Sequence, residues 1–297
     1  MEKIIQTEQR NPYSVNIDLM SSREIVGVMN QEDKKVAIAL EKELDNIAKA
    51  VDLISEAFIK GGSLLYFGAG TSGRLGILDA SECPPTFSVP PDMVRGYIAG
   101  GDEAIKTSIE GAEDSFDGGE RDLINSGAKP EDVVVGISAS GNATYIQGVL
   151  SRAQSLNITT VGIACNTEAK IKQYSEVFIC PVVGPEVLTG STRLKSGTAQ
   201  KMVLNMLTTA SMIRIGKTYE NYMIDVNPSN VKLKDRATRI VAEIAGIPYE
   251  EALKYLQISG FRVKPAVMMA MSGLSLEESE DLLDKNNGRL RAALSSG

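Results

Sequence analysis

The chain has 297 residues, enough for one large domain and a small one, and its 43% hydrophobic and 23% charged residues are typical of a folded soluble protein. With 31 Lys and Arg residues against 38 Asp and Glu residues, the formal net charge is −7, which argues against nucleic acid or an anionic membrane as a partner. Histidine is absent, which excludes a Ser-His-Asp triad, a His general base and His-ligated metals. Acid–base chemistry must use Glu, Asp, Lys, Tyr or Cys.

The sequence also bears on secretion, membrane insertion and the redox state of the cysteines. Residues 1–5 are not followed by the long apolar stretch of a signal peptide, and no segment reaches the roughly 18 apolar residues of a membrane-spanning helix. Cys83, Cys165 and Cys180 are scattered without a C-x-x-C pattern, which predicts free buried thiols in a reducing compartment. We therefore expect a cytoplasmic protein.

The first 59 residues precede any strand signal. Residues up to about 22 are typical of a loop, and residues 22–59 follow a helical pattern. We expect a short first helix and a second one from about Asp33 to Ile59, ended by Gly61-Gly62.

The stretch from Leu64 to Arg74 predicts a phosphate site. Four apolar residues, typical of a buried strand, lead into a loop that contains Thr71, Ser72 and Gly73, and a helix begins near Arg74. Glycines let the backbone approach an anion, and the free N–H groups at the helix start point at it. The loop is not a Walker loop, because no Gly-Lys-Ser/Thr closes it. Its glycines have the G-x-G-x-x-G spacing of a dinucleotide site, but Ser and Thr lie between them, which favours a sugar phosphate as the ligand. The alternative is a tight structural turn.

Strands and helices then alternate up to about residue 215. The expected strands are 64–67, 94–99, 133–137, 159–164 and 177–181, and the expected helices are 102–114, one ending near 155, and 194–215. This order predicts an α/β fold, a parallel sheet with helices on both faces, whose ligands bind at the carboxyl ends of the strands. We expect this domain to span residues 1–230, and residues 231–297 to form a small helical bundle with a capping box at Ser275 and Glu278.

Further candidate residues lie beyond the first loop. Glu82 precedes Pro84-Pro85, where we expect the helix to end, and a carboxylate there suits a general acid; the alternative is a surface Glu before a kink. The segment 110–114 contains Glu113, in an acidic stretch that is also typical of a surface helix end.

Two more segments offer polar groups for an anion. Ser138, Ser140 and Asn142 surround a turn glycine after the strand 133–137, and they repeat the chemistry of the first loop, although such residues are also ordinary helix caps. Ser191 and Lys195 belong to the hydroxyl- and cation-rich stretch before the helix 194–215, which forms either an anion site or a solvated loop.

The run GAGTSGRLGILDASECPP resembles the signature of the N-acetylmuramic acid 6-phosphate etherase family. That family carries a SIS (sugar isomerase) domain and is related to the glucokinase regulatory protein. The segments 111–114 and 189–195 are also similar to family motifs. Where the family often has Thr two residues after the second loop's glycine, this chain has Ala143, followed by Thr144.

The resemblance implies a fold, a reaction and roles. It implies a SIS-type domain with a UBA-like C-terminal appendage. The substrate would be N-acetylmuramic acid 6-phosphate, cleaved to N-acetylglucosamine 6-phosphate and D-lactate in cell-wall sugar recycling. Glu82 would protonate the departing lactate and activate water, and Glu113 would remove the C2 proton; the reverse assignment fits the sequence nearly as well. Neither step needs a cofactor or metal.

Two other functions stay open on the sequence. A sugar-phosphate aldose–ketose isomerase would use the same kind of pocket, and a non-catalytic sugar-phosphate sensor would bind without turnover. The regulatory relative has two SIS units and this chain one, which argues against the sensor and favours a homodimer in which the helix 33–59 packs on a partner.

Overall fold

The computed structural model describes residues 5–226 and 230–296, which form two compact units. The first unit contains the residues up to Ser81 and those from Pro91 to Thr209. The second contains Glu82–Pro90 and the residues from Ala210 onward.

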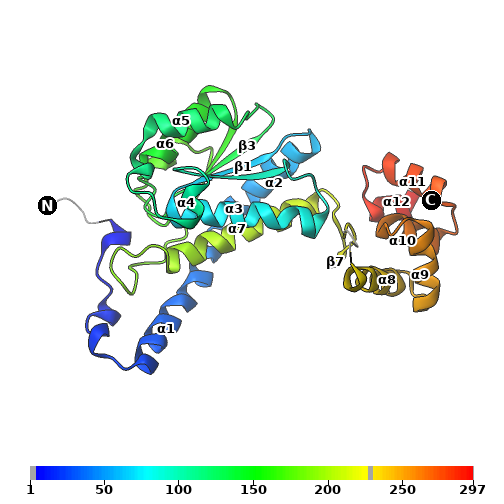
Figure 1. Cartoon of the computed structure of the whole chain (residues 1–297), viewed down its shortest axis with the longest axis horizontal. Coiled ribbons are helices and arrows are strands. Elements are labelled where there is room, and N and C mark those ends of the chain that lie inside the picture. The colour runs from blue at the N-terminus through cyan, green and yellow to red at the C-terminus, as the bar shows by residue number, and fades with distance from the viewer. Residues whose placement is uncertain (1–4, 227–229, 297) are drawn as a thin grey trace. The chain divides into compact units, whose positions relative to one another are not determined.

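The first unit is built on a parallel sheet with the strand order β2-β1-β3-β4-β5 (Figure 1). Its strands are β1 (Leu64–Gly68), β2 (Val94–Ile98), β3 (Val133–Ile137), β4 (Thr159–Ile163) and β5 (Val177–Ile179). All residues of β1 and β3 are buried, as expected for the middle of a parallel sheet that is covered on both faces. The predicted α/β fold is therefore confirmed.

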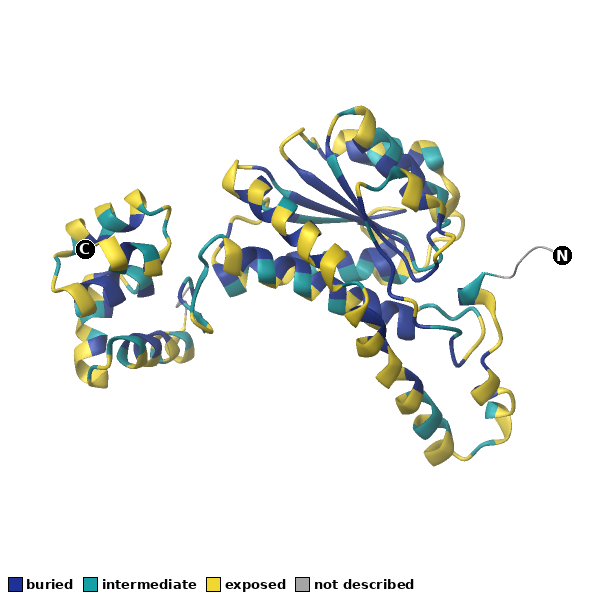
Figure 2. Ribbon diagram, turned by 180° about the vertical axis from the view of Figure 1, so that it is seen from behind, coloured by how far each residue is buried: buried dark blue, intermediate teal, exposed yellow. Residues whose placement is uncertain are grey.

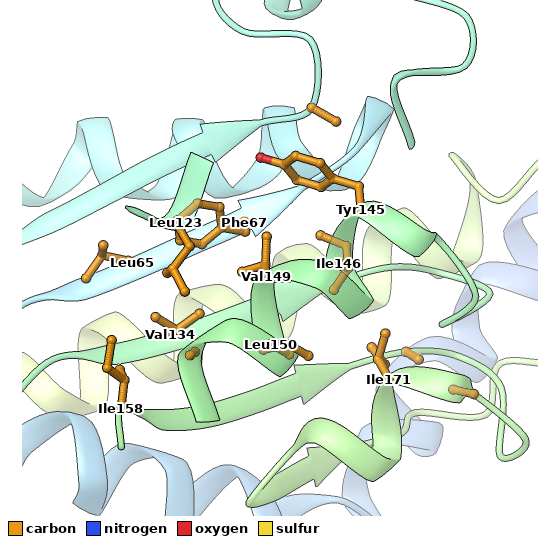
Figure 3. Packing of buried hydrophobic residues seen from close by; sticks show 14 residues of the cluster. Leu65, Phe67, Leu123, Val134, Tyr145, Ile146, Val149, Leu150, Ile158 and Ile171 are labelled. Atoms are coloured by element: carbon orange, nitrogen blue, oxygen red, sulfur yellow. The ribbon is translucent and has the colours of Figure 1, made fainter. Parts of the chain in front are cut away.

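Helices cover the sheet on two sides, with α5 (Phe116–Asn125) and α6 (Thr144–Ser155) on one and α3 (Gly70–Phe87) and α7 (Lys195–Arg214) on the other (Figure 1). Leu65, Phe67 and Val134 point from their strands toward Val149 and Leu150 of α6 (Figure 3). The next residue along β1, Tyr66, faces the other side, where its hydroxyl donates to Asp79 of α3 over 3.0 Å. Successive side chains of a strand point to opposite faces of the sheet, as these residues of β1 do.

The N-terminal helices differ from the prediction. The helix expected from Asp33 to Ile59 is two helices, α1 (Ser22–Glu41) and α2 (Leu44–Ile59), separated at Lys42 and Glu43. A capping box at Ser21 and Glu24 starts α1. The buried residues of α1 all lie in its second half, and its first half is half-buried or exposed (Figure 2).

The prediction that Pro84 and Pro85 end α3 is wrong, because α3 runs through both prolines to Phe87. Proline's fixed φ is compatible with a helix, but each proline removes an N–H donor and its ring crowds the carbonyl four residues before it. The last turn remains bonded, since the Ser88 N–H donates to the Pro84 carbonyl over 2.9 Å. Ser88 itself has a φ of 49°, in the left-handed region, and there the chain leaves the helix.

The helix expected over residues 102–114 is also wrong, because α4 contains only Glu103–Lys106. The Arg74 guanidinium of α3 donates to the carbonyls of Ala104 over 2.8 Å and of Ile105 over 2.9 Å. A continuing helix would need those carbonyls for the N–H groups four residues on. The chain therefore turns away, passes Gly111 and forms a single 3-10 turn at Ala112–Asp114 before α5 begins.

The second unit is mainly helical. A short hairpin of β6 (Thr218–Tyr219) and β7 (Tyr222–Met223) precedes α8 (Val231–Ala245), α9 (Tyr249–Ile258), α10 (Val263–Ser272), α11 (Leu276–Lys285) and α12 (Leu290–Ser296). These helices share a core that includes Leu256, Val267 and Leu283. The capping box predicted at Ser275 and Glu278 is confirmed. Within the part of the chain that the structure describes, no helix is both long and apolar enough to cross a membrane.

Candidate active site

The first turn of α3 lies directly over the end of β1, and two glycines make this approach possible. A Cβ on Gly68 would lie 2.4 Å from the Gly73 nitrogen, and a Cβ on Gly73 would lie 2.5 Å from Ile98 Cγ1 of β2. Gly70, the first residue of the helix, has a φ of +54°. The first N–H groups of a helix have no intrahelical acceptor and carry the positive end of its dipole. The turn is therefore built to receive an anion.

The second hydroxyl-rich loop leaves the neighbouring strand at the same edge of the sheet. Gly68 of β1 is paired in parallel with Ile137 of β3, so the loops that follow are neighbours. The Ser138 hydroxyl accepts the Gly141 N–H over 3.1 Å, and the Ser140 hydroxyl accepts the Asn142 N–H over 3.2 Å. Each hydroxyl keeps its own proton for donation, which is what a phosphate oxygen needs.

A cavity of about 360 Å³ opens at this edge, between the ends of β1 and β2. It is lined by Ala69, Gly70, Arg74, Ala99, Ala104, Ser108, Ile109, Glu110, Gly111, Ala112 and Glu113. The structure thus brings Glu113 to the same cavity as the start of α3. Arg74 and Glu110 also line it, and the sequence reasoning did not single out either of them.

Glu113 sits on the 3-10 turn at Ala112–Asp114, which follows Gly111 in a left-handed conformation with a φ of 73°. Its side chain is exposed. The Thr144 hydroxyl at the start of α6 donates to the Glu113 main-chain carbonyl over 3.4 Å. Thr144 therefore contacts the segment that carries the carboxylate, and Ala143 before it makes no side-chain cap.

Glu82 lies in a different place from Glu113. It is exposed on the second half of α3 and does not line the cavity. It comes twelve residues after Gly70 in the same helix, a rise of about 18 Å.

Thr71 and Ser72 face α7 rather than open solvent. Ser72 is buried, and its hydroxyl donates to the Gln200 side-chain oxygen over 2.9 Å. A Cβ built on Gly197, one turn before Gln200, would lie 3.6 Å from the Thr71 methyl group. Gly73 contributes close packing, as described above.

Lys195, expected at an anion, is instead held inside the protein. Its side chain is 1% exposed, and its ammonium donates to Glu32 of α1 over 2.6 Å and to the Val183 carbonyl over 2.9 Å. The carboxylate of Glu186, also fully buried, accepts the N–H groups of Lys195 and Ser196 over 3.0 and 2.9 Å. Glu186 therefore caps α7, and Lys195 ties α7 to α1.

The electrostatics of Glu32 follow from this pairing. Burial by itself would raise the pKa of Glu32, but hydrogen bonds from Lys195 and Lys35 outweigh burial and hold the pKa below its ordinary value of 4.5.

Ser191, the other predicted residue of this segment, lies half-buried in the loop before α7, where its N–H donates to the Leu188 carbonyl over 2.9 Å.

The fold and the two hydroxyl-rich loops define the class of a SIS-domain protein, and comparison with known proteins agrees. The model of the glucokinase regulatory protein N-terminal SIS domain matches residues 46–154, and that of the SIS domain matches residues 112–210. The chain is similar in fold to a phosphoheptose isomerase from Francisella tularensis, with a TM-score of 0.51 and 16% identity over 66% of this chain and 98% of that one.

Full-length relatives narrow the class to one family. The chain is 53% identical to an N-acetylmuramic acid 6-phosphate etherase from Brucella anthropi, over 98% of this chain and 94% of the relative. It is 55% identical to one from Actinobacillus pleuropneumoniae serotype 5b, over 97% and 95%. The chain belongs to the N-acetylmuramic acid 6-phosphate etherase family.

The buried ion pair predicts that Lys195 acts on stability. Lys195→Met should lower the free energy of unfolding by about 1–3 kcal/mol, because it removes the buried cation and leaves the Glu32 carboxylate paired only with the half-exposed Lys35. Urea unfolding measures this, and Glu32→Gln added to Lys195→Met should recover part of the loss. Because folding lowers the pKa of Glu32, its ionised carboxylate stabilises the fold at pH values above about 4.5, and this stabilisation is lost as the pH falls through the lowered pKa. Normal stability with weakened sugar-phosphate binding would contradict this role.

Proposed function

We propose that this chain is a carbon–oxygen lyase that cleaves the D-lactyl ether of N-acetylmuramic acid 6-phosphate, giving N-acetylglucosamine 6-phosphate and D-lactate. Family membership over nearly the whole chain is the observation that carries this proposal. The cavity at the start of α3, which is lined both by the first residue of that helix and by Glu113, supports it.

The chemistry explains why a carboxylate is needed. An ether is hard to hydrolyse because alkoxide is a poor leaving group, but opening the sugar ring gives a carbonyl at C1 that makes the C2 proton acidic. We assign removal of that proton to Glu113. The electron pair left on C2 then expels lactate from C3, and the lactate oxygen takes a proton from Glu82. A C2–C3 double bond conjugated to the carbonyl remains.

In the second half of the reaction, water adds to the C2–C3 double bond in the reverse order of these steps. The Glu82 carboxylate takes a proton from water as its oxygen bonds to C3, and Glu113 returns a proton to C2. Both glutamates end in their starting states, and each positioned acid or base accounts for about 10²–10⁴-fold in rate. The first turn of α3 and the donors of the second loop would hold the 6-phosphate, which orients C2 and C3.

We also propose that the active form is a homodimer. The first half of α1 carries Ile25, Val28 and Met29 half-buried and Val26 exposed, an apolar surface that a second chain would cover. A dimer also gives Glu82 a role consistent with its place on α3. Because the helix carries Glu82 about 18 Å beyond Gly70, we propose that Glu82 serves the substrate bound by the partner chain.

The first test is release of D-lactate from N-acetylmuramic acid 6-phosphate by the purified chain, with a chelator present. Release at a rate of about 1–10³ s⁻¹, typical of enzymes, is the expected result. Isomerisation of the sugar phosphate without lactate would replace the proposal with an isomerase, and binding without turnover would replace it with a sensor.

Deuterium exchange separates the two glutamates. In D₂O, Glu82→Ala should lose lactate release but still exchange the C2 proton, because the base at C2 remains. Glu113→Ala should lose both. Mass spectrometry of recovered substrate measures the exchange. The matched control is Asp114→Ala, an exposed carboxylate on the same 3-10 turn that does not line the cavity. If Glu82→Ala loses exchange and Glu113→Ala retains it, the two roles must be reversed.

Mixing the two inactive variants tests whether a site uses two chains. In a dimer of one Glu82→Ala chain and one Glu113→Ala chain, one site would keep both glutamates. Refolding the variants together in equal amounts should therefore restore about a quarter of the wild-type activity. Each variant refolded alone controls for residual activity. No recovery, with mixed dimers present by mass spectrometry, would place both glutamates in one chain.

A further inference from the structure

The carboxamide of Gln200 is a buried polar group that the mechanism above does not use. Gln200 lies in the second turn of α7 and is 1% exposed. Its Oε1 accepts the Ser72 hydroxyl over 2.9 Å, which places the carboxamide against the first turn of α3. Its Nε2 is buried and has no hydrogen-bond partner among the residues that the structure describes.

An unpaired amide at this position needs an explanation. The large majority of buried side-chain polar atoms in folded proteins have a partner, and leaving a donor unsatisfied costs about 1–3 kcal/mol. The neighbours of Gln200 on α7, Ala199 and Val203, are completely buried, so the backbone that carries the amide is fixed by packing. A ligand group that reaches this position would supply the missing partner for Nε2.

The place where Gln200 meets α3 is itself a site for an anion. The N–H groups of Gly70, Thr71 and Ser72 open the 18-residue helix and lack intrahelical acceptors. The Ser72 hydroxyl proton is directed to Gln200, so this hydroxyl presents lone pairs to a ligand and not a proton. A phosphate group is made of acceptors and needs donors. The Gln200 amide supplies the donor that Ser72 does not.

We propose that Gln200 is the α7 member of the phosphate site, a substrate-binding residue whose Nε2 donates a hydrogen bond to the phosphate of the bound sugar phosphate while its Oε1 fixes Ser72. This inference rests on the proposed function for the identity of the ligand. It predicts that the residue discriminates the phosphorylated sugar from the free sugar and does not merely join two helices.

Two substitutions separate these roles. Gln200→Glu keeps the length of the side chain and the acceptor for Ser72, but it replaces the donor with a carboxylate that repels phosphate. Gln200→Met removes both hydrogen bonds with little change in volume. The matched control is Thr208→Val, because Thr208 also joins α7 to α3, through Asp79 over 3.3 Å, and lies two to three turns further along the helix.

The measurement is the dissociation constant of the full-length variants for N-acetylglucosamine 6-phosphate and for N-acetylglucosamine, by calorimetry, alongside thermal unfolding. Gln200→Met should weaken binding of the phosphorylated sugar about 10- to 100-fold, as expected for one hydrogen bond to a charged group, and leave the free sugar unchanged. Gln200→Glu should weaken it further, with partial recovery as the pH is lowered and the new carboxylate is protonated. Thr208→Val should bind as the wild type does.

The inference is overturned if folded Gln200→Met binds the phosphorylated sugar like Thr208→Val, or if it loses both sugars equally. If Gln200→Glu does not fold, the binding measured for Gln200→Met still tests the proposed role of Gln200. Failure of the proposed function is a separate result, because it would appear as absent lactate release by the wild-type chain, whereas the binding ratio is measured without turnover.

Discussion

The close approach of α3 to β1 and β2 is the constraint on which the rest of the candidate site depends. Gly68 and Gly73 leave no room for a Cβ, and Gly76 would place one 2.9 Å from Tyr66. Because the helix begins so near the strand end, its first N–H groups open at the carboxyl edge of the sheet, where the second loop begins. A methyl group at Gly68 or Gly73 would lift the helix start off the sheet, and the anion-binding turn would no longer face that edge.

Much of this arrangement was predictable from local patterns. Continuous apolar runs marked the strands, the hydroxyl- and glycine-rich stretches marked both loops, and the strand–helix alternation gave the parallel sheet. The errors came where a long-range contact overrides a local signal. Nothing near Ala104 in the sequence reveals that Arg74 takes its carbonyl and ends α4. At Pro84 and Pro85 the local rule predicted a helix end, but α3 continues through both prolines and ends at Phe87.

Lys195 shows a second limit of sequence reasoning. A lysine among Ser, Thr and Gly at a helix start has the composition of an anion site, and burial cannot be read from that composition. The structure instead surrounds its ammonium with the Glu32 carboxylate and the Val183 carbonyl, which are 151 residues apart in sequence. Gln200 follows in the same polar stretch, and its residue type alone does not predict the binding role that we propose for it. That proposal depends on a buried nitrogen without a partner among the described residues, which only the structure reveals.

The helix α3 carries or contacts most of the groups that the proposed reaction needs. The start of α3 forms the anion-binding turn, and one turn later Arg74 fixes α4 by its carbonyls, which determines where the chain reaches Gly111 and the turn that carries Glu113. Gln200 of α7 bonds to the same first turn. Glu82 belongs to α3 as well, but about 18 Å further on. This separation along α3 is the reason for our proposal that a reaction using both glutamates at one sugar draws on α3 of two chains.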